Sequence, residues 1–325
     1  MPSHRFSLAL ALALFPAAGI AGSPHTAREF LERGNQRLVV GDYRGADQDY
    51  SRAIDLATKL GDSTYYPGDK WKGSDSPVVD ESTHRIRAID PSVAALYSNR
   101  CLARYRQNNI SAALTDCNES IAIDPRVIAA FKNRALVHSA RGDLDEALSD
   151  LNRVLQVETS DGQSYNNRGT VYRRKQKLDL ALADYTHAIE LLAPIPGVFC
   201  NRGSVRYELH DFDGASADFE ESIRLDPKFA FGHYGRGAIH LRNRQYHLAL
   251  ESLTLAIKLD PKLAIAYANR GIASFCLGQA DEARADFERS FQLDPTLKEP
   301  MAKHLKLLRV NLTMDQVLLA STLIS

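Results

Sequence analysis

The sequence has no excess of charge, few cysteines and no set of clustered metal ligands. Forty basic and forty acidic residues give the 325-residue chain a formal net charge of zero. A neutral chain lacks the long-range attraction that nucleic acid or an anionic membrane surface requires, so we expect no nucleic-acid partner. Evenly spaced His233, His240 and His247 have no Cys or carboxylate beside them to complete a ligand set. We therefore expect neither a metal nor another cofactor.

Four cysteines are too few for a disulfide scaffold, which leaves only specific pairs open. Cys101 and Cys117 fall on the two helices of one predicted hairpin, where small residues pack. Two buried thiols acting as small apolar residues are favoured there over a disulfide. Cys200 and Cys276 lie far apart in the sequence and are expected to be unpaired.

The N-terminus has the pattern of a signal peptide. Arg5 precedes an apolar run from Phe6 to Ala21, which ends in small residues typical of a cleavage site before Gly22. The run has about 16 residues, fewer than the roughly 20 that a spanning helix needs, so a membrane anchor is disfavoured. The sequence thus predicts export to a periplasm or the extracellular space, with no stable membrane span after cleavage.

A three-residue step, Asn-Arg-Gly, recurs along the chain. Its copies, some with one substitution, begin at Asn99, Asn133, Asn167, Asn201, Gly235 and Asn269, each 34 residues after the last. A fixed period of this size indicates stacked supersecondary units rather than one globular core.

Each period contains two runs with helical spacing of apolar residues. In residues 94–127 the runs are 94–107 and 111–123, separated by Asn108-Asn109 and closed by Asp124-Pro125. The same frame predicts antiparallel helix pairs at 128–161, 162–195, 196–229, 230–263 and 264–297. In each pair a small residue of the first helix is expected to face an alanine twelve positions later, as Gly203 would face Ala215, with a larger apolar residue such as Phe219 beside them.

This pattern resembles that of the tetratricopeptide repeat family. The likeness is carried by the small residue of the step, the aromatic residue or leucine three or four positions before it, the alanine twelve after it, and the closing Asp-Pro. It covers about residues 26–297. The resemblance implies an all-α fold: a right-handed superhelical solenoid of about seven antiparallel helix pairs with a C-terminal capping helix. It also implies that the first helices line a concave groove.

Repeat one is separated from repeat two by an insertion of about one repeat length. The expected division is a signal peptide (1–21), repeat one (22–60), the insertion (61–93), repeats two to seven (94–297), and a capping helix with an apolar tail (298–325). The insertion holds the single Trp, Trp71, and residues 81–89 are expected to form a short helix. Whether the insertion is an ordered flap or a floppy loop stays open.

The groove supplies the candidate binding residues. An asparagine amide has donors and an acceptor that match a peptide backbone, and the recurring asparagines resemble the asparagine ladder of some family members. The alternative is that they cap backbone groups or bind the adjacent helix. The peptide-binding candidates are Asn99, Asn133, Asn167, Asn201, Asn269, Tyr105, Lys132, Arg173, Tyr207, Phe231, Tyr234 and Phe275.

The arginine of each step is followed sixteen residues later by an aspartate, except in repeat six. Repeated salt bridges that fix the packing, either across the helix pair or to the next repeat, are expected for these pairs. The pairs are Arg33 with Asp49, Arg100 with Asp116, Arg134 with Asp150, Arg168 with Asp184, Arg202 with Asp218 and Arg270 with Asp286. In repeat six Ser252 replaces the aspartate, which would leave Arg236 available to a ligand.

The sequence predicts a non-enzymatic adaptor in the cell envelope that binds a peptide or partner protein in the groove. The unassigned insertion has no nucleophile and base constellation to support an enzyme. A self-assembling envelope scaffold is the alternative, in which the apolar C-terminal segment binds a second copy of the chain. An accessory subunit of an enzyme complex is a further alternative.

Overall fold

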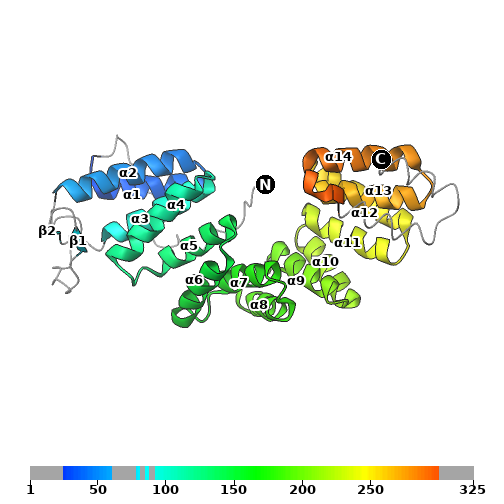
Figure 1. The fold of residues 1–325 in the computed structure, drawn as a ribbon, viewed down its shortest axis with the longest axis horizontal. Helices are drawn as coiled ribbons and strands as arrows, with labels where there is room; N and C mark the ends of the chain where they lie inside the picture. Colours follow the sequence, from blue (N-terminus) through cyan, green and yellow to red (C-terminus); the bar gives the residue numbers. More distant parts are fainter. Residues whose placement is uncertain (1–24, 61–77, 81–84, 88–91, 300–325) are drawn as a thin grey trace. The chain divides into compact units, whose positions relative to one another are not determined.

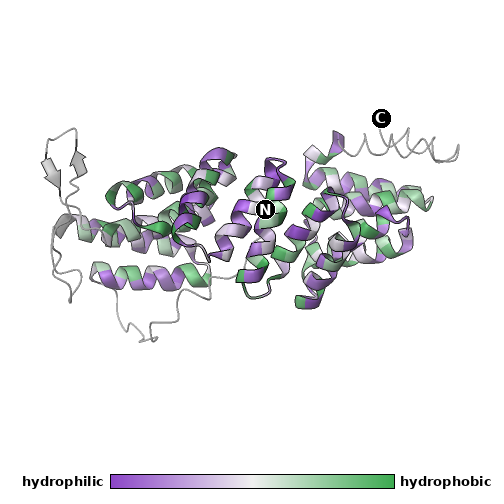
Figure 2. Ribbon diagram, turned by 90° about the horizontal axis from the view of Figure 1, so that it is seen from below, coloured by the Kyte–Doolittle hydropathy of each residue, from purple (hydrophilic) through white to green (hydrophobic). Residues whose placement is uncertain are grey.

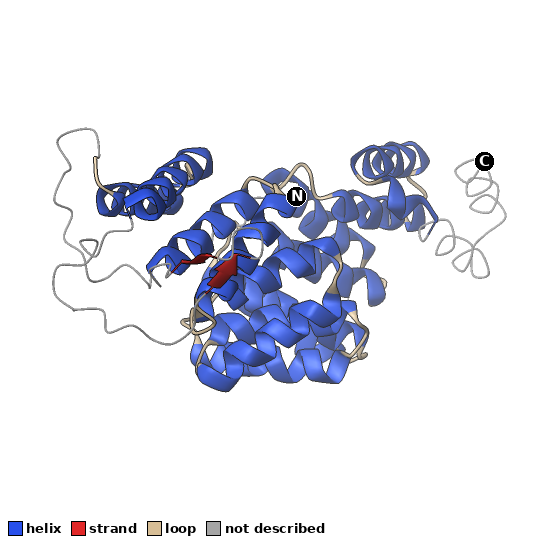
Figure 3. Cartoon of the chain, turned by 60° about the vertical axis from the view of Figure 1, so that its left-hand side comes forward, coloured by secondary structure: helices blue, strands red, loops and turns tan. Residues whose placement is uncertain are grey.

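The computed structural model describes residues 25–60, 78–80, 85–87 and 92–299 (Figure 1). The predicted signal peptide and apolar tail lie outside these residues, as do most of the insertion and all but the first two residues of the predicted capping segment. The chain forms two compact units, one ending at Val171 and one beginning at Tyr172. Apart from one short hairpin of strands, the described regular structure is helical (Figure 3).

Antiparallel helix pairs build the N-terminal unit. Its helices are α1 (Ala27–Val40), α2 (Tyr43–Leu60), α3 (Ser92–Arg106), α4 (Ile110–Ile123), α5 (Ile128–Arg141), α6 (Leu144–Val157) and α7 (Gly162–Arg174), whose last three residues belong to the second unit. Within each pair the two helices pack along their length, and the second helix of one pair packs on the first helix of the next, as α2 does on α3. The predicted all-α array of helix pairs is confirmed.

The C-terminal unit repeats this arrangement. Its helices are α8 (Leu178–Leu191), α9 (Pro196–Glu208), α10 (Phe212–Leu225), α11 (Ala230–Arg242), α12 (Tyr246–Leu259), α13 (Ala264–Cys276) and α14 (Ala280–Leu293), followed by the 3-10 turn η1 (Pro295–Leu297). First helices of successive pairs lie side by side, α9 against α11 and α11 against α13. Apolar and polar residues are interspersed along single helices in Figure 2, as expected for helices with one buried side. None of the helices within the described residues is long and apolar enough to cross a membrane.

Local signals set the helix ends. Thr26 caps α1 through its hydroxyl, and Glu29 returns the bond to the Thr26 backbone. At the ends of α4, α10, α12 and α14 the aspartate of the closing Asp-Pro accepts a hydrogen bond from the backbone two residues later, at 2.9 to 3.0 Å. This local turn explains why these four repeats end at the same place.

The glycine of the step allows a large side chain to lie on the first helix. A Cβ on Gly34 would come within 2.7 Å of the Tyr50 ring, and one on Gly203 within 3.0 Å of Phe219. The closest contact of the glycine is thus with the ring sixteen positions later, the larger apolar residue that the sequence pattern places beside the glycine and alanine. The alanines at the twelve-residue offset are fully buried beside it.

Cys101 and Cys117 occupy these two positions in repeat two and form a disulfide. The preference for two buried thiols was wrong. In repeats one, five, six and seven a Cβ at the first position would meet the side chain at the second, so two cysteines at these positions lie close enough to bond. Cys200 and Cys276 are free, as predicted.

The insertion does not interrupt the stacking of repeats one and two. The second helix of repeat one packs on the first helix of repeat two, although 31 residues separate Leu60 from Ser92. Within the insertion, β1 (Val78–Asp80) pairs antiparallel with β2 (Arg85–Arg87). The short helix expected over 81–89 was wrong, because Val78, Val79 and Ile86 are β-branched residues that favour strands.

Candidate functional site

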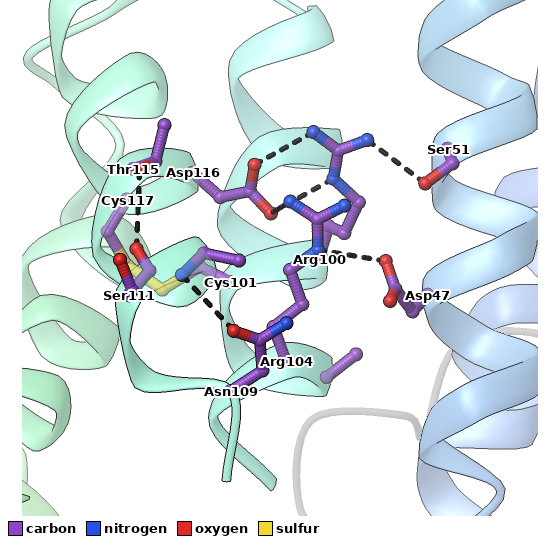
Figure 4. Close-up of polar contacts among 12 residues, drawn as sticks. Asp47, Ser51, Arg100, Cys101, Arg104, Asn109, Ser111, Thr115, Asp116 and Cys117 are labelled. Carbon is purple, nitrogen blue, oxygen red and sulfur yellow. Dashed lines mark hydrogen bonds and ion pairs between the residues drawn. A yellow bond between two sulfur atoms is a disulfide. The ribbon is translucent and has the colours of Figure 1, made fainter. Parts of the chain in front are cut away.

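Arg100 joins three helices through one guanidinium group (Figure 4). Its Nε and Nη2 donate to the two carboxylate oxygens of Asp116 on α4, at 2.9 and 2.8 Å. The remaining nitrogen, Nη1, donates to the Ser51 hydroxyl on α2 of the preceding repeat, at 3.0 Å. Desolvation opposes the charge of Arg100, but Asp116 outweighs it and the pKa of Arg100 is raised. The planar fork of arginine suits this use, because it reaches a carboxylate with two parallel bonds and still has a donor for a third group.

The two-bond pairing recurs in both units. Besides Arg100 with Asp116, it is formed by Arg33 with Asp49, Arg134 with Asp150, Arg202 with Asp218 and Arg270 with Asp286. The aspartates are buried and the arginines are partly exposed. Each pair ties the first helix of a repeat to its second helix.

The bond to the preceding repeat also recurs, and the sequence reasoning missed it. Arg134 donates to Asn118, Arg168 to Asn152 and Arg270 to Thr254, each sixteen residues earlier, at 2.8 to 3.4 Å. The acceptors share a signal that could have been found, since each is a short polar residue two positions after the aspartate position of its repeat. The step arginine therefore stabilises both the helix pair and the stacking of neighbouring pairs.

Aromatic rings complete the surroundings of the step arginine. The guanidinium carbon lies 5.2 to 5.7 Å from the centroid of the aromatic ring three residues earlier, a cation–π distance. These pairs are Phe30 with Arg33, Tyr97 with Arg100, Phe131 with Arg134, Tyr165 with Arg168, Phe199 with Arg202 and Tyr267 with Arg270.

Repeat six keeps its arginine in place with other partners. Arg236 Nε donates to the Ser252 hydroxyl at 3.2 Å, and Nη2 lies 3.2 Å from His233 Nδ1. The other ring nitrogen of His233 lies 2.9 Å from the Pro227 carbonyl oxygen. The expectation that Arg236 is available to a ligand was wrong, because histidine and serine replace the usual ring and carboxylate. Within the described residues no group of His, Cys, Asp or Glu could hold a metal ion.

Three asparagines of the row, Asn99, Asn133 and Asn269, hydrogen-bond to the preceding repeat. Asn133 Nδ2 donates to the Ser98 backbone oxygen at 3.0 Å and to its hydroxyl at 3.2 Å. Asn99 donates to Asn35 at 3.2 Å, and Asn269 hydrogen-bonds the Tyr234 hydroxyl. Asn167 accepts from Gln163 at 3.1 Å on its own helix. These bonds fit the alternative interpretation of the row, in which the asparagines bind the adjacent helix rather than a peptide.

Two predicted basic contacts are engaged in ion pairs. Lys132 binds Glu158 and Asp161 at the end of its repeat, the second at 2.9 Å. Arg173 donates to Glu208 through Nε at 2.7 Å. Tyr105 is half-buried and packs beside the disulfide. A ligand at any of these positions would meet groups that already have partners.

Half-buried aromatic residues gather on the first helices of the C-terminal unit. Tyr207 of α9 and Phe231 and Tyr234 of α11 are partly exposed. Burial raises the pKa of Tyr234 to about 12, and its hydroxyl is held by Asn269. We call Tyr207, Phe231, Tyr234 and Asn269 the aromatic face. Phe275, predicted to join it, is 2% exposed and belongs to the core with Ile272 and Phe287, so that prediction was wrong.

A shallow hollow of about 460 Å³ lies in the N-terminal unit, along α2 between α1 and α3. Its lining is charged and includes Arg33, Asp47, Asp49 and Arg104. Asp49 already binds Arg33, and Asp47 binds Arg104 at 3.0 Å. The hollow is therefore lined by ion pairs that hold neighbouring helices together.

Repeated helix pairs, locked by the same arginine contacts and presenting side-by-side first helices, define a helical-repeat protein. Models of the tetratricopeptide repeat match residues 132–193, 200–264 and 264–297. The chain is a tetratricopeptide repeat protein. No curated protein matches the sequence at a significant level.

Solved structures of other repeat proteins share the fold. A tetratricopeptide repeat protein from Parabacteroides merdae has a TM-score of 0.59 at 17% identity, over 82% of this chain and 93% of its own. Yeast Tom70 has a TM-score of 0.56 at 19% identity, over 98% of this chain and 62% of its own. PilF of Pseudomonas aeruginosa has a TM-score of 0.53 at 19% identity, over 62% of this chain and 92% of its own.

Proposed function

We propose that this chain is a non-enzymatic adaptor that binds an extended segment of a partner protein on the aromatic face. The observation that carries the proposal is the placement of Tyr207, Phe231 and Tyr234 on adjacent first helices, partly exposed although large and aromatic. Rigid aromatic side chains give large contact area at a low cost in conformational entropy, and tyrosine adds a polar group.

Export of the chain is part of the proposal. The buried Cys101–Cys117 disulfide supports it, because disulfides persist in oxidising compartments and are rare in the cytosol. Together with the N-terminal apolar segment, it favours a periplasmic or extracellular location for the adaptor.

Affinity capture from an envelope extract tests this function. Residues 22–325 would serve as bait, beside a Tyr207→Ala/Phe231→Ala variant and a Leu248→Ala control. Leu248 is an apolar residue of α12 that is 44% exposed and lies outside the aromatic face. We expect one partner, identified by mass spectrometry, to be captured by the wild-type chain and the control and lost from the double variant. Equal capture by all three chains would contradict the aromatic face as the binding surface.

A further inference from the structure

Arg242, the last residue of α11, differs from the step arginines. They lie over a ring of their own helix, at 5.2 to 5.7 Å. Arg242 instead lies over Phe212 of the preceding repeat, with its guanidinium carbon 3.6 Å from the ring centroid. Among the described residues it forms no ion pair, and its hydrogen bond is to the Asn243 side chain at 3.2 Å. Arg242 is therefore an exposed, stacked guanidinium with donors left over.

The ring beneath Arg242 is fixed by its own neighbours. Phe212 packs in the cluster around Ala215 and Phe219. Tyr207 meets it edge to face, with centroids 5.3 Å apart, and His210 lies 5.7 Å away. A guanidinium stacked on a fixed ring keeps its plane and loses less freedom when it binds a carboxylate.

Most acidic groups of the neighbouring turn already have partners. Glu208 binds Arg173, and Asp211 lies 3.5 Å from Arg206 and accepts a bond from the Gly214 backbone. Asp213 is the exposed acid that remains in this turn. His210 and Arg244 are exposed in the equivalent turns of repeats five and six.

Backbone strain accompanies these basic residues. His210 and Arg244 have φ of 64° and 57°, at the turn position where Gly41, Gly142 and Gly278 stand in other repeats. A side chain in this left-handed region costs on the order of 1 kcal/mol relative to glycine. Asn108 and Gln176 have the same conformation at this turn position of other repeats, so the strain belongs to the array and does not single out these two side chains.

We propose that Arg242, stacked on Phe212 and flanked by His210, binds a carboxylate of an acidic peptide that lies along the aromatic face. Tyr207 packs edge to face against Phe212, the ring beneath Arg242, so the carboxylate site continues the aromatic face. The inference rests on the proposed function and names its partner chemistry: an extended segment that carries Asp or Glu beside apolar residues.

Fluorescence anisotropy with two labelled peptides tests the site. One peptide alternates glutamate with leucine, and the other replaces each glutamate with glutamine. The proteins are the chain from residue 22, Arg242→Gln, Arg242→Lys and Arg244→Gln. Arg244→Gln is the matched control, because it removes the same charge two residues away without a stacked ring.

We expect the wild-type chain to prefer the glutamate peptide. Arg242→Gln should weaken that binding about tenfold or more, the value of a charged hydrogen bond. Arg242→Lys should also weaken it, since lysine lacks the planar fork, while Arg244→Gln should change it less than twofold. Thermal melts would show that each variant remains folded.

Three results would overturn the site. They are equal losses in Arg242→Gln and Arg244→Gln, equal binding of the two peptides, and full displacement of the glutamate peptide by millimolar inorganic phosphate alone. The two proposals can also be separated in the envelope experiment. If Arg242→Gln still captures the partner but Tyr207→Ala/Phe231→Ala does not, the adaptor function is supported and the carboxylate site is contradicted.

Discussion

The Arg100 guanidinium pairs edge to edge with the Asp116 carboxylate, in two hydrogen bonds of 2.9 and 2.8 Å, and a second arginine reaches the same carboxylate. Arg104 Nη1 lies 2.9 Å from Asp116, whose side chain is 2% exposed. The same double pairing occurs at Asp49 with Arg33 and Arg37. A single buried carboxylate thus holds two cations at the contact between α3 and α4.

Asp116→Ala should lower the free energy of unfolding by about 3 kcal/mol or more, because it leaves two partly buried guanidinium groups without their counter-ion. Glu32→Ala is the matched control. Its pair with Arg28 is exposed on both sides, at 55% and 44%, and such pairs contribute less than about 1 kcal/mol. Urea unfolding followed by circular dichroism would measure both. Similar losses in the two variants would show that the buried pair has no special role.

Removal of the disulfide in Cys101→Ala/Cys117→Ala should cost about 3 kcal/mol through the loss of a loop constraint of this length. Cys101→Gly/Cys117→Tyr should lose less, because it restores the glycine and ring that Gly34 and Tyr50 form in repeat one. Thermal melts of the two double variants under reducing conditions would compare them. A lower melting temperature for the glycine and tyrosine variant would contradict the equivalence of the two arrangements.

Asn133→Ala should destabilise the chain by about 1 kcal/mol, since its amide donates to both the backbone and the hydroxyl of Ser98. Gln156→Ala, an exposed change on α6, should stay within about 0.5 kcal/mol of the wild type. Chemical denaturation of the variants would check this. Unchanged stability together with weakened partner capture would favour the peptide-binding role of the asparagine row.

Alkaline pH should destabilise the chain partly through Cys200. Burial raises the pKa of this thiol from 9.0 to about 12. The unfolded state therefore loses its proton first, and the contribution to stability is fully present below pH 9.0 and lost as the pH rises to about 12. In Cys200→Ala the free energy of unfolding should fall less steeply over this range. Tyrosines titrate in both proteins, so only the difference between their curves of unfolding free energy against pH reports on Cys200. Parallel curves would contradict the raised pKa of this thiol.

Periodicity was enough to predict the fold. The 34-residue recurrence predicts helix pairs because every unit must bury the same side against its neighbours, and the arginine and aspartate offset identifies a contact between the two helices of a unit. The disulfide and the close approach of Gly203 to Phe219 depend on which positions face each other, and helical spacing does not specify this between two helices.

The binding surface was less predictable from the sequence. Phe275 and Tyr207 stand at the same position of their repeats, yet one is buried and the other is partly exposed. Phe275 packs in a core cluster with Ile272 and Phe287, whereas Tyr207 lies at the border of its cluster. Likewise, the asparagines were expected in the groove by their register, while their hydrogen bonds depend on the residues that the preceding repeat presents.

The bond from Arg100 to Ser51 bears on how the array unfolds. In a linear array, cooperativity depends on the free energy of each interface relative to that of each repeat. The Arg100 guanidinium binds both the carboxylate of its own repeat and an acceptor of the previous repeat. It therefore couples the unfolding of the two repeats, so that neighbours melt together rather than one at a time. Arg33 has no earlier repeat to contact within the described residues, so fraying is expected to begin at repeat one, and loss of the Ser51 hydroxyl would separate its melting from that of repeat two.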